Sequence, residues 1–212
     1  ATDIQVEKQY DSNIWLDSEA SNRKVLLRME PNNILMGDCY LQTPPLFIGN
    51  TDHIGIVGDN GCGKTTLIKE IISSIFDDVR MLYIPQEPTE LQKTETLRKI
   101  KGLSNSQRGR VLSIVAQLNS DPDYVLAGES TSPGEMRKLM LAQGMLESPE
   151  LIVMDEPTNY LDLGSTVALE RLLSEYPGAL LLVSHDLSLI DSATSIKWSI
   201  QRLNNNFELV VQ

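Results

Sequence analysis

The sequence predicts an α/β fold in which helices cover both faces of a mostly parallel sheet. Residues 151–154 and 179–183 are continuously apolar, as is typical of strands buried on both faces of a parallel sheet. Segments with apolar residues at helical spacing lie between the apolar runs, so strands and helices alternate along the chain. At 212 residues, the chain fits one large domain or two small ones.

Short apolar or β-branched runs between turn residues predict the strands of the first half. They cover residues 14–16, 25–27, 46–48, 54–57 and 81–84. Residues 30–45 contain three prolines and Gly37, which predicts loops around at most one short edge strand. Residues 64–76 place apolar side chains at steps of three and four, which predicts a helix with one buried face. Residues 1–12 are polar and predict a frayed end.

The second half alternates in the same way. Residues 90–118 have helical spacing, which we expect Gly102 and Gly109 to interrupt, and residues 119–134 have the composition of a loop. The further elements predicted are helices at 135–147 and 165–175, the two buried strands, and a terminal hairpin of residues 196–203 and 207–211.

The composition argues against several classes of protein. There are 29 acidic and 18 basic residues, a net charge of -11, so nucleic acid is a poor first guess for a partner. Two cysteines exclude a disulfide scaffold and favour a reducing, cytoplasmic setting. No apolar run approaches the ~18 residues of a membrane span. The chain begins at Ala1 without a leader pattern, as expected for a fragment or a processed product.

Residues 58–65 match the phosphate-binding pattern G-x-x-x-x-G-K-[ST] between a predicted strand and a predicted helix. Glycines let successive backbone N–H groups face one anion, and the helix N-terminus adds its dipole. We expect Lys64 to reach the β- and γ-phosphates and Thr65 to bind Mg²⁺. The alternative is an ordinary glycine-rich turn, which the flanking elements disfavour. The predicted nucleotide-binding residues are Gly58, Asp59, Asn60, Gly61, Cys62, Gly63, Lys64, Thr65 and Thr66.

Two carboxylates, Asp155 and Glu156, directly follow the apolar strand at residues 151–154. We expect Asp155 to hold Mg²⁺ through water and Glu156 to polarise an attacking water. An isolated pair of this kind favours a solvated strand end, but the phosphate-binding pattern upstream reverses that preference.

Two further polar residues follow predicted strands. His185 comes after residues 179–183, where it is expected to bond the γ-phosphate and help hold Glu156, although a lone histidine is more often structural. Gln86 comes after residues 81–84, and its amide is expected to reach Mg²⁺ or the water. By itself, Gln86 is an ordinary loop residue. The candidate catalytic residues are thus Glu156, His185 and Gln86, and the candidate metal ligands are Thr65, Gln86 and Asp155.

These motifs resemble an ATP-binding-cassette (ABC) nucleotide-binding domain. The phosphate-binding loop, Gln86, the carboxylate pair, Asp162 and His185 occur in the order and spacing of that family, over roughly residues 12–212. The resemblance implies a P-loop NTPase fold, which is a RecA-like core with a small antiparallel β subdomain and an inserted α-helical subdomain. It implies one domain over residues 1–212, with the core at 12–92 and 147–212 and the helical subdomain at 93–146.

The resemblance also implies Mg²⁺ and ATP as cofactors and a second ABC domain as a head-to-tail partner. The signature loop that would contact the partner's ATP reads Ser132-Pro133-Gly134-Glu135, and Pro133 departs from the usual glycine, removing an N–H and fixing φ. Asp162 is implied to lie in the dimer-interface loop. Because one domain supplies half of each composite site, slow ATPase activity is expected of the isolated chain.

A finer resemblance is to the ABC-F proteins, which carry two such domains and act on the ribosome. It is carried by the stretches EPTNYLD (residues 156–162) and YIPQE (residues 83–87). The SPGE signature resembles the ABC-F members that protect ribosomes, which implies a role in translation and antibiotic resistance. The alternatives are the ATPase subunit of an ABC membrane transporter and a non-hydrolysing, ATP-gated scaffold.

Two smaller questions stay open at this stage. Residues 93–110 contain six basic residues and one acidic residue, which indicates either a phosphate-bearing partner or a solvated helix face. An aromatic side chain is implied to stack on adenine, and Trp15 and Tyr40 are both candidates.

Overall fold

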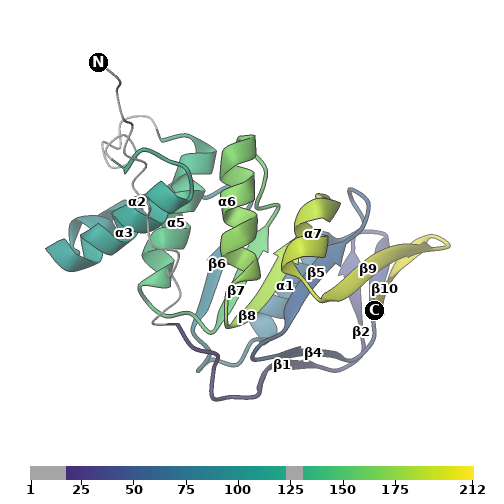
Figure 1. Ribbon diagram of the computed structural model, residues 1–212. Helices are drawn as coiled ribbons and strands as arrows, with labels where there is room; N and C mark the ends of the chain where they lie inside the picture. Colours follow the sequence, from purple (N-terminus) through teal and green to yellow (C-terminus); the bar gives the residue numbers. More distant parts are fainter. Residues whose placement is uncertain (1–17, 123–130) are drawn as a thin grey trace.

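The computed structural model describes residues 18–122 and 131–212, which form an α/β fold with two sheets (Figure 1). Within this part of the chain, the larger sheet has eight strands in the order β2-β3-β10-β9-β5-β8-β7-β6, and β1 pairs with β4 in a small antiparallel sheet. The strands are β1 Val25–Met29, β2 Asn32–Met36, β3 Cys39–Thr43, β4 Leu46–Gly49, β5 His53–Val57, β6 Met81–Ile84, β7 Leu151–Asp155, β8 Ala179–Val183, β9 Ile196–Leu203 and β10 Asn206–Val211.

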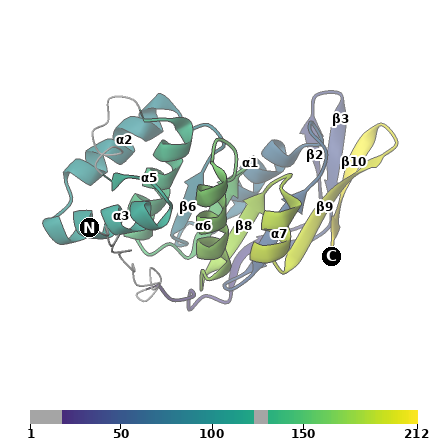
Figure 2. The same cartoon turned by 45° about the horizontal axis from the view of Figure 1, so that its top comes forward.

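Helices cover both faces of the large sheet. Helix α1 (Lys64–Ser74) lies on one face, and α6 (Leu163–Ser174) and α7 (Leu187–Ala193) lie on the other (Figure 1). Helices α2 (Glu90–Lys101), α3 (Asn105–Gln117) and α5 (Pro133–Met145) pack together at the β6 end of the sheet, opposite the β2–β3 hairpin (Figure 2).

The central strands are apolar throughout because each of their faces is buried in a different core. In β7, Ile152 and Met154 pack into the cluster beneath α3, α5, α6 and α7. Leu151 and Val153 point the other way, into the cluster that contains α1 and the small sheet. Alternating side chains on opposite faces of a strand produce this division. The predicted strands at 151–154 and 179–183 are therefore confirmed.

The prediction of at most one strand in residues 30–45 is wrong, because β2 and β3 form a hairpin there. The prolines stand outside both strands, and Gly37 is a turn residue with φ of 66°. A positive φ at the first turn residue matches the twist of two-residue hairpins. Gly37 therefore joins two strands where the sequence analysis treated it as a breaker.

Three further details differ from prediction. Gly102 ends α2 as expected, but Gly109 lies inside α3 and does not interrupt it. Helix α5 begins two residues before the predicted start, because Ser132 caps it and Pro133 fits its first turn. Helix α7, which the sequence analysis did not identify, follows β8 and is capped by Asp186.

The expectations for residues 1–12, for the strand at 14–16 and for residues 123–130 of the predicted loop lie outside the described residues. The arrangement of sheet and helices is the predicted α/β class, with a helical group at one end and an antiparallel hairpin at the other. The division of the chain into a core and a helical subdomain stays a prediction. In the described part of the chain, every helix is too short or too polar to cross a bilayer.

Gly37 and Gly109 allow a matched test of the hairpin turn, since a Cβ at either position would meet nothing within 4 Å. Gly37→Ala should lower the free energy of unfolding by about 1 kcal/mol, because only the left-handed φ is unfavourable. Gly109→Ala should raise it by about 0.8 kcal/mol, because α3 gains a better helix former. Urea unfolding of both variants measures this difference, and equal effects would contradict the turn assignment.

Candidate nucleotide-binding site

The candidate site lies at the carboxyl ends of β5, β6 and β7. These strands are parallel, so the segments that follow them meet at one edge of the sheet. A cavity of about 300 Å³ opens there. It is lined by Met36, Asn60, Gly61, Gly63, Lys64, Thr65, Thr66, Gln86, Asp155 and Glu156. The structure thus gathers residues from three separate predicted motifs, together with Met36, around one space.

The phosphate-binding loop runs from β5 into α1 and needs glycine at two left-handed positions. Gly61 has φ of 77° and Gly63 has φ of 104°. No side chain of the described residues caps the amino end of α1, whereas α2, α3, α5, α6 and α7 each have a side-chain cap. The first backbone N–H groups of α1 therefore face the cavity without a protein acceptor, as an anion site requires.

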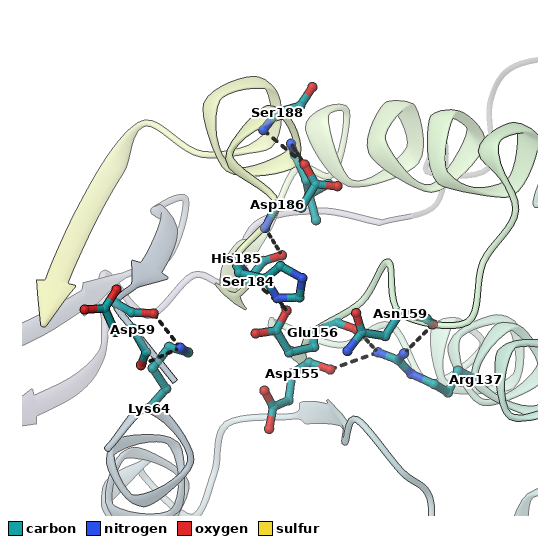
Figure 3. A network of polar contacts seen from close by, with 12 residues as sticks. Asp59, Lys64, Arg137, Asp155, Glu156, Asn159, Ser184, His185, Asp186 and Ser188 are labelled. Carbon is teal, nitrogen blue, oxygen red and sulfur yellow. Dashed lines mark hydrogen bonds and ion pairs between the residues drawn. The ribbon is translucent and has the colours of Figure 1, made fainter. Parts of the chain in front are cut away.

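Three predicted members of the loop, Gly58, Asp59 and Cys62, shape it without lining the cavity. Lys64 Nζ donates to the carbonyl oxygens of Gly58 (2.6 Å) and Asp59 (3.1 Å), as Figure 3 shows in part. The Cys62 side chain is buried in the core, and burial raises the pKa of its thiol. A Cβ on Gly58 would lie 2.7 Å from Cys62 Sγ, so the glycine is needed for this close approach. The buried Cys62 side chain therefore packs the phosphate-binding loop against the core.

Asp155 and Glu156 are both buried at the cavity wall. Burial and the neighbouring Glu156 carboxylate raise the pKa of Asp155, while Arg137 and Lys64 oppose the rise. A desolvated carboxylate suits a metal-ion ligand, since a bound cation favours the ionised form. The geometry is compatible with the predicted role of Asp155.

Glu156 has a left-handed backbone, with φ of 46°, which is unfavourable for a residue other than glycine. Hydrogen bonds hold it on both sides. Its N–H donates to the Val183 carbonyl at 2.7 Å, and its own carbonyl accepts from Arg137 at 2.9 Å. Arg137 also donates to the carbonyls of Asp155 (2.9 Å) and Asn159 (3.2 Å) (Figure 3). One buried guanidinium thus fixes the turn that presents both acids.

The sequence analysis assigned no role to Arg137. Its side chain is 3% exposed on a helix whose residues from Gly134 to Met145 are almost all buried. Burial lowers the pKa of its guanidinium, and the carboxylates of Asp155 and Glu156 oppose that shift. A charged residue on a helix that is buried almost throughout must find buried partners. An arginine within this mostly buried helix was the sequence signal that could have indicated a structural role for Arg137.

His185 and Glu156 lie together, as predicted. The Nδ1 atom of His185 is 2.8 Å from Glu156 Oε2, and the His185 backbone N–H donates to the same oxygen at 3.3 Å (Figure 3). The His185 side chain is 63% exposed while that of Glu156 is 9% exposed. The carboxylate is therefore oriented by a partly solvated ring. What these residues do in catalysis stays a prediction.

The candidate metal ligands, Thr65, Gln86 and Asp155, all line the cavity. In residues 18–122 and 131–212, no three His, Cys, Asp or Glu side chains are grouped so as to hold a metal ion by themselves. A hydroxyl, an amide and one carboxylate suit Mg²⁺, which takes few protein ligands and completes its shell with water and phosphate oxygens. The residues present therefore fit a magnesium ion bound together with a nucleotide.

The signature loop does not line this cavity. The Ser132 hydroxyl accepts from the Glu135 N–H at 3.2 Å and caps α5, while Pro133 occupies a first-turn position where an N–H has no helical partner. Pro133 therefore costs the helix nothing. Gly134 is buried, and a Cβ there would lie 2.7 Å from the Tyr160 carbonyl oxygen, so glycine allows the 156–162 segment to approach α5.

Asp162 is exposed and caps α6, accepting from the Ser165 N–H at 2.7 Å. That hydrogen bond holds the pKa of its carboxyl below the ordinary value. A capping role explains an aspartate at this position within one chain. Its predicted place in a dimer interface stays a prediction.

The sequence model of the family described as "ABC transporter" matches residues 45–159, more than half of the chain. The chain belongs to this ABC family. The match spans the phosphate-binding loop, the signature loop and both carboxylates.

Among curated proteins, this chain is 31% identical to the ATP-binding protein Uup of Escherichia coli. The match covers 69% of this chain and 26% of Uup. It is 32% identical to the ribosome protection protein VmlR of Bacillus subtilis, over 76% of this chain and 31% of VmlR. It is 30% identical to the zinc import ATP-binding protein ZnuC of Pseudomonas fluorescens, over 80% of this chain and 71% of ZnuC. The chain thus spans less than half of Uup or VmlR.

Among solved structures, the ABC chain is similar to the RNase-L Inhibitor, with a TM-score of 0.67 and 24% identity, over 90% of this chain and 40% of that one. At this identity, the likeness shows the fold alone. It confirms the predicted P-loop NTPase fold class.

The buried position of Arg137 generates a stability prediction. Arg137→Gln should lower the free energy of unfolding by about 3 kcal/mol, because carbonyls that share the charged donor lose it in a buried setting. Arg171→Gln is the matched control, since Arg171 pairs with Glu175 on an exposed surface, and it should change stability by less than about 0.5 kcal/mol. Urea unfolding distinguishes the two, and similar small losses would refute the bracing role of Arg137.

Proposed function

We propose that this ABC domain binds and hydrolyses Mg-ATP in a head-to-tail pair with a second ABC domain. The observation that carries the proposal is the single cavity lined by Lys64 and Thr65 on one side and by Asp155 and Glu156 on the other. The proposal assigns these phosphate-binding groups and carboxylates to one triphosphate.

Each group has a distinct task in this proposal. The free N–H groups of the loop and the amino end of α1 bind phosphate oxygens, and Lys64 turns from the loop carbonyls to the terminal phosphates. Thr65, Gln86 and Asp155 hold Mg²⁺, which supplies charge neutralisation when bound. Glu156 orients and polarises the attacking water, and His185 keeps the Glu156 carboxylate in place and contacts the γ-phosphate.

The pairing with a second domain is supported by the signature loop. Ser132 and Pro133 are exposed at the amino end of α5, and they lie outside the cavity of their own chain. A helix N-terminus that faces outward suits an anion carried by another molecule. Together with Gly134 and Glu135, these residues would complete the partner's site, with Asp162 near the interface. Hydrolysis by the isolated chain is then slow.

For the whole protein, we propose a cytoplasmic ABC-F role on the ribosome, in translation and in protection from antibiotics. The support is the similarity to VmlR, a ribosome protection protein, and the ABC-F-like stretches at 83–87 and 156–162. The second candidate is the ATPase subunit of a membrane transporter, which the similarity to ZnuC over 71% of that protein favours.

Glu156→Gln tests the hydrolytic proposal. The amide keeps the shape of the side chain but cannot accept a proton, so phosphate release should fall by about 1,000-fold while Mg-ATP binding is retained. Glu175→Gln, at an exposed ion pair, is the control and should keep the parent rate. Phosphate release and calorimetric ATP titration measure both quantities, and an unchanged rate would remove Glu156 from the mechanism.

The Glu156→Gln variant also separates the two candidate roles. Since it should trap the ATP-bound state, it is expected to co-sediment with purified ribosomes in ATP and to dissociate in ADP. The same experiment with Lys64→Ala should give no ATP-dependent co-sedimentation. Equal recovery in ATP and ADP, or none in either, would contradict the ribosomal proposal and leave the transporter role as the better candidate.

A further inference from the structure

We propose that Lys138 is a positioning residue for the pairing of two domains. It holds the Glu135 carboxylate inward and so keeps negative charge away from the end of α5 that receives the partner's triphosphate. The inference rests on the proposed function and concerns how the signature loop accepts a polyanion. Lys138 is a buried charge, only 6% exposed, to which the proposed mechanism gives no task.

The Lys138 ammonium has three protons and three acceptors. Its Nζ donates to Ser120 Oγ and Ser165 Oγ, both at 2.7 Å, and to Glu135 Oε1 at 3.3 Å. Ser120 follows α3, and Ser165 lies in the first turn of α6. A lysine whose protons are all bonded to buried or partly buried groups has a fixed position, so its charge is held beside Glu135.

The Glu135 side chain is turned away from the end of its own helix. In α2 and α3, the side chain three residues after the cap, Gln92 or Gln107, accepts from the backbone N–H of the cap residue. Glu135 has the same position in α5, but only the Ser132 hydroxyl caps that helix. The carboxylate bonds to Lys138 instead, and within the described part of the chain its Oε2 atom is buried without a hydrogen-bond partner.

This inward orientation of Glu135 is the costlier of the two. A carboxylate in a first turn is stabilised by the helix dipole and by the cap N–H when it lies over the helix end. A buried oxygen without a donor costs free energy, and such a group in a folded protein calls for an explanation. The inward position leaves the amino end of α5, with Ser132 and Pro133 exposed on it, clear of negative charge.

A clear helix end matters because the ligand in this proposal is a polyanion. A carboxylate over the first turn would compete with phosphate for the N–H groups and would repel it. Lys138 also acts on a second acid. Hydrogen bonds from Ser165, followed by the charge of Lys138, hold the pKa of the Asp162 carboxyl below its ordinary value. Both acids that the proposal puts near the partner, Glu135 and Asp162, thus lie in the field of one ammonium.

The test measures ATP-dependent self-association of the whole chain by sedimentation velocity, in the Glu156→Gln background that should trap the ATP-bound state. Lys138→Met should weaken the pair by at least about tenfold, because the freed Glu135 carboxylate then opposes the partner's triphosphate. Adding Glu135→Gln should restore pairing to within about threefold of the parent. Calorimetric Mg-ATP binding to the chain's own cavity should be the same in all of these variants.

Two further variants complete the test. Lys93→Met is the matched control, because Lys93 pairs with Glu90 at the same i,i+3 spacing on the exposed surface of α2, and it should leave pairing unchanged. Glu135→Gln alone should also pair like the parent, since the charge that it removes is already compensated. This variant retains Lys138, so it tests the inference even where Lys138→Met does not fold.

Three results would overturn the inference. Parent-like pairing of Lys138→Met would show that Glu135 needs no compensating charge. A loss that Glu135→Gln does not restore would show that Lys138 only supports the packing of α5. Pairing strengthened by more than about tenfold in Glu135→Gln alone would show that the carboxylate faces the partner. Failure of the proposed function gives a different result: a Glu156→Gln parent that binds Mg-ATP but stays monomeric refutes the pairing itself, and this inference with it.

Discussion

The buried guanidinium of Arg137 holds the chain where it leaves β7 and turns toward α6. Its bonds to the carbonyls of Asp155, Glu156 and Asn159 join helix α5 to the end of the central sheet. Without a charged donor at this point, a left-handed glutamate next to a buried aspartate would be an unstable arrangement, because backbone strain and desolvation would both be uncompensated. The chemistry of the site therefore depends on a residue that does not line the cavity.

The polar cavity depends equally on the two apolar cores beneath it. Strands β5, β7 and β8 are anchored on both faces, so their carboxyl ends have little freedom to shift. The loop, the acids and His185 all begin at those ends. A rigid sheet with short segments at its edge can hold several polar groups within hydrogen-bonding reach of one ligand.

Sequence reasoning located the buried strands and the residues that meet at the cavity, because apolar runs and the spacing of glycine, lysine and carboxylates are local signals. It failed where the decisive contact is distant in sequence. Gly37 was misread since a hairpin and a loop break share the same turn residue, and only pairing of β2 with β3 distinguishes them. The importance of Arg137 depends on carbonyls about twenty residues away.

Helix α5 carries two features that were described separately, the capped end at Ser132 and Pro133 and, one turn further, Arg137. If that end of α5 shifts, the hydrogen bond from Arg137 carries the shift to the carbonyl of Glu156. Gly134 lies so close to the Tyr160 backbone that there is no room for a side chain between α5 and the 156–162 segment. Through these contacts, the amino end of α5 and the backbone that presents both acids form one mechanical unit.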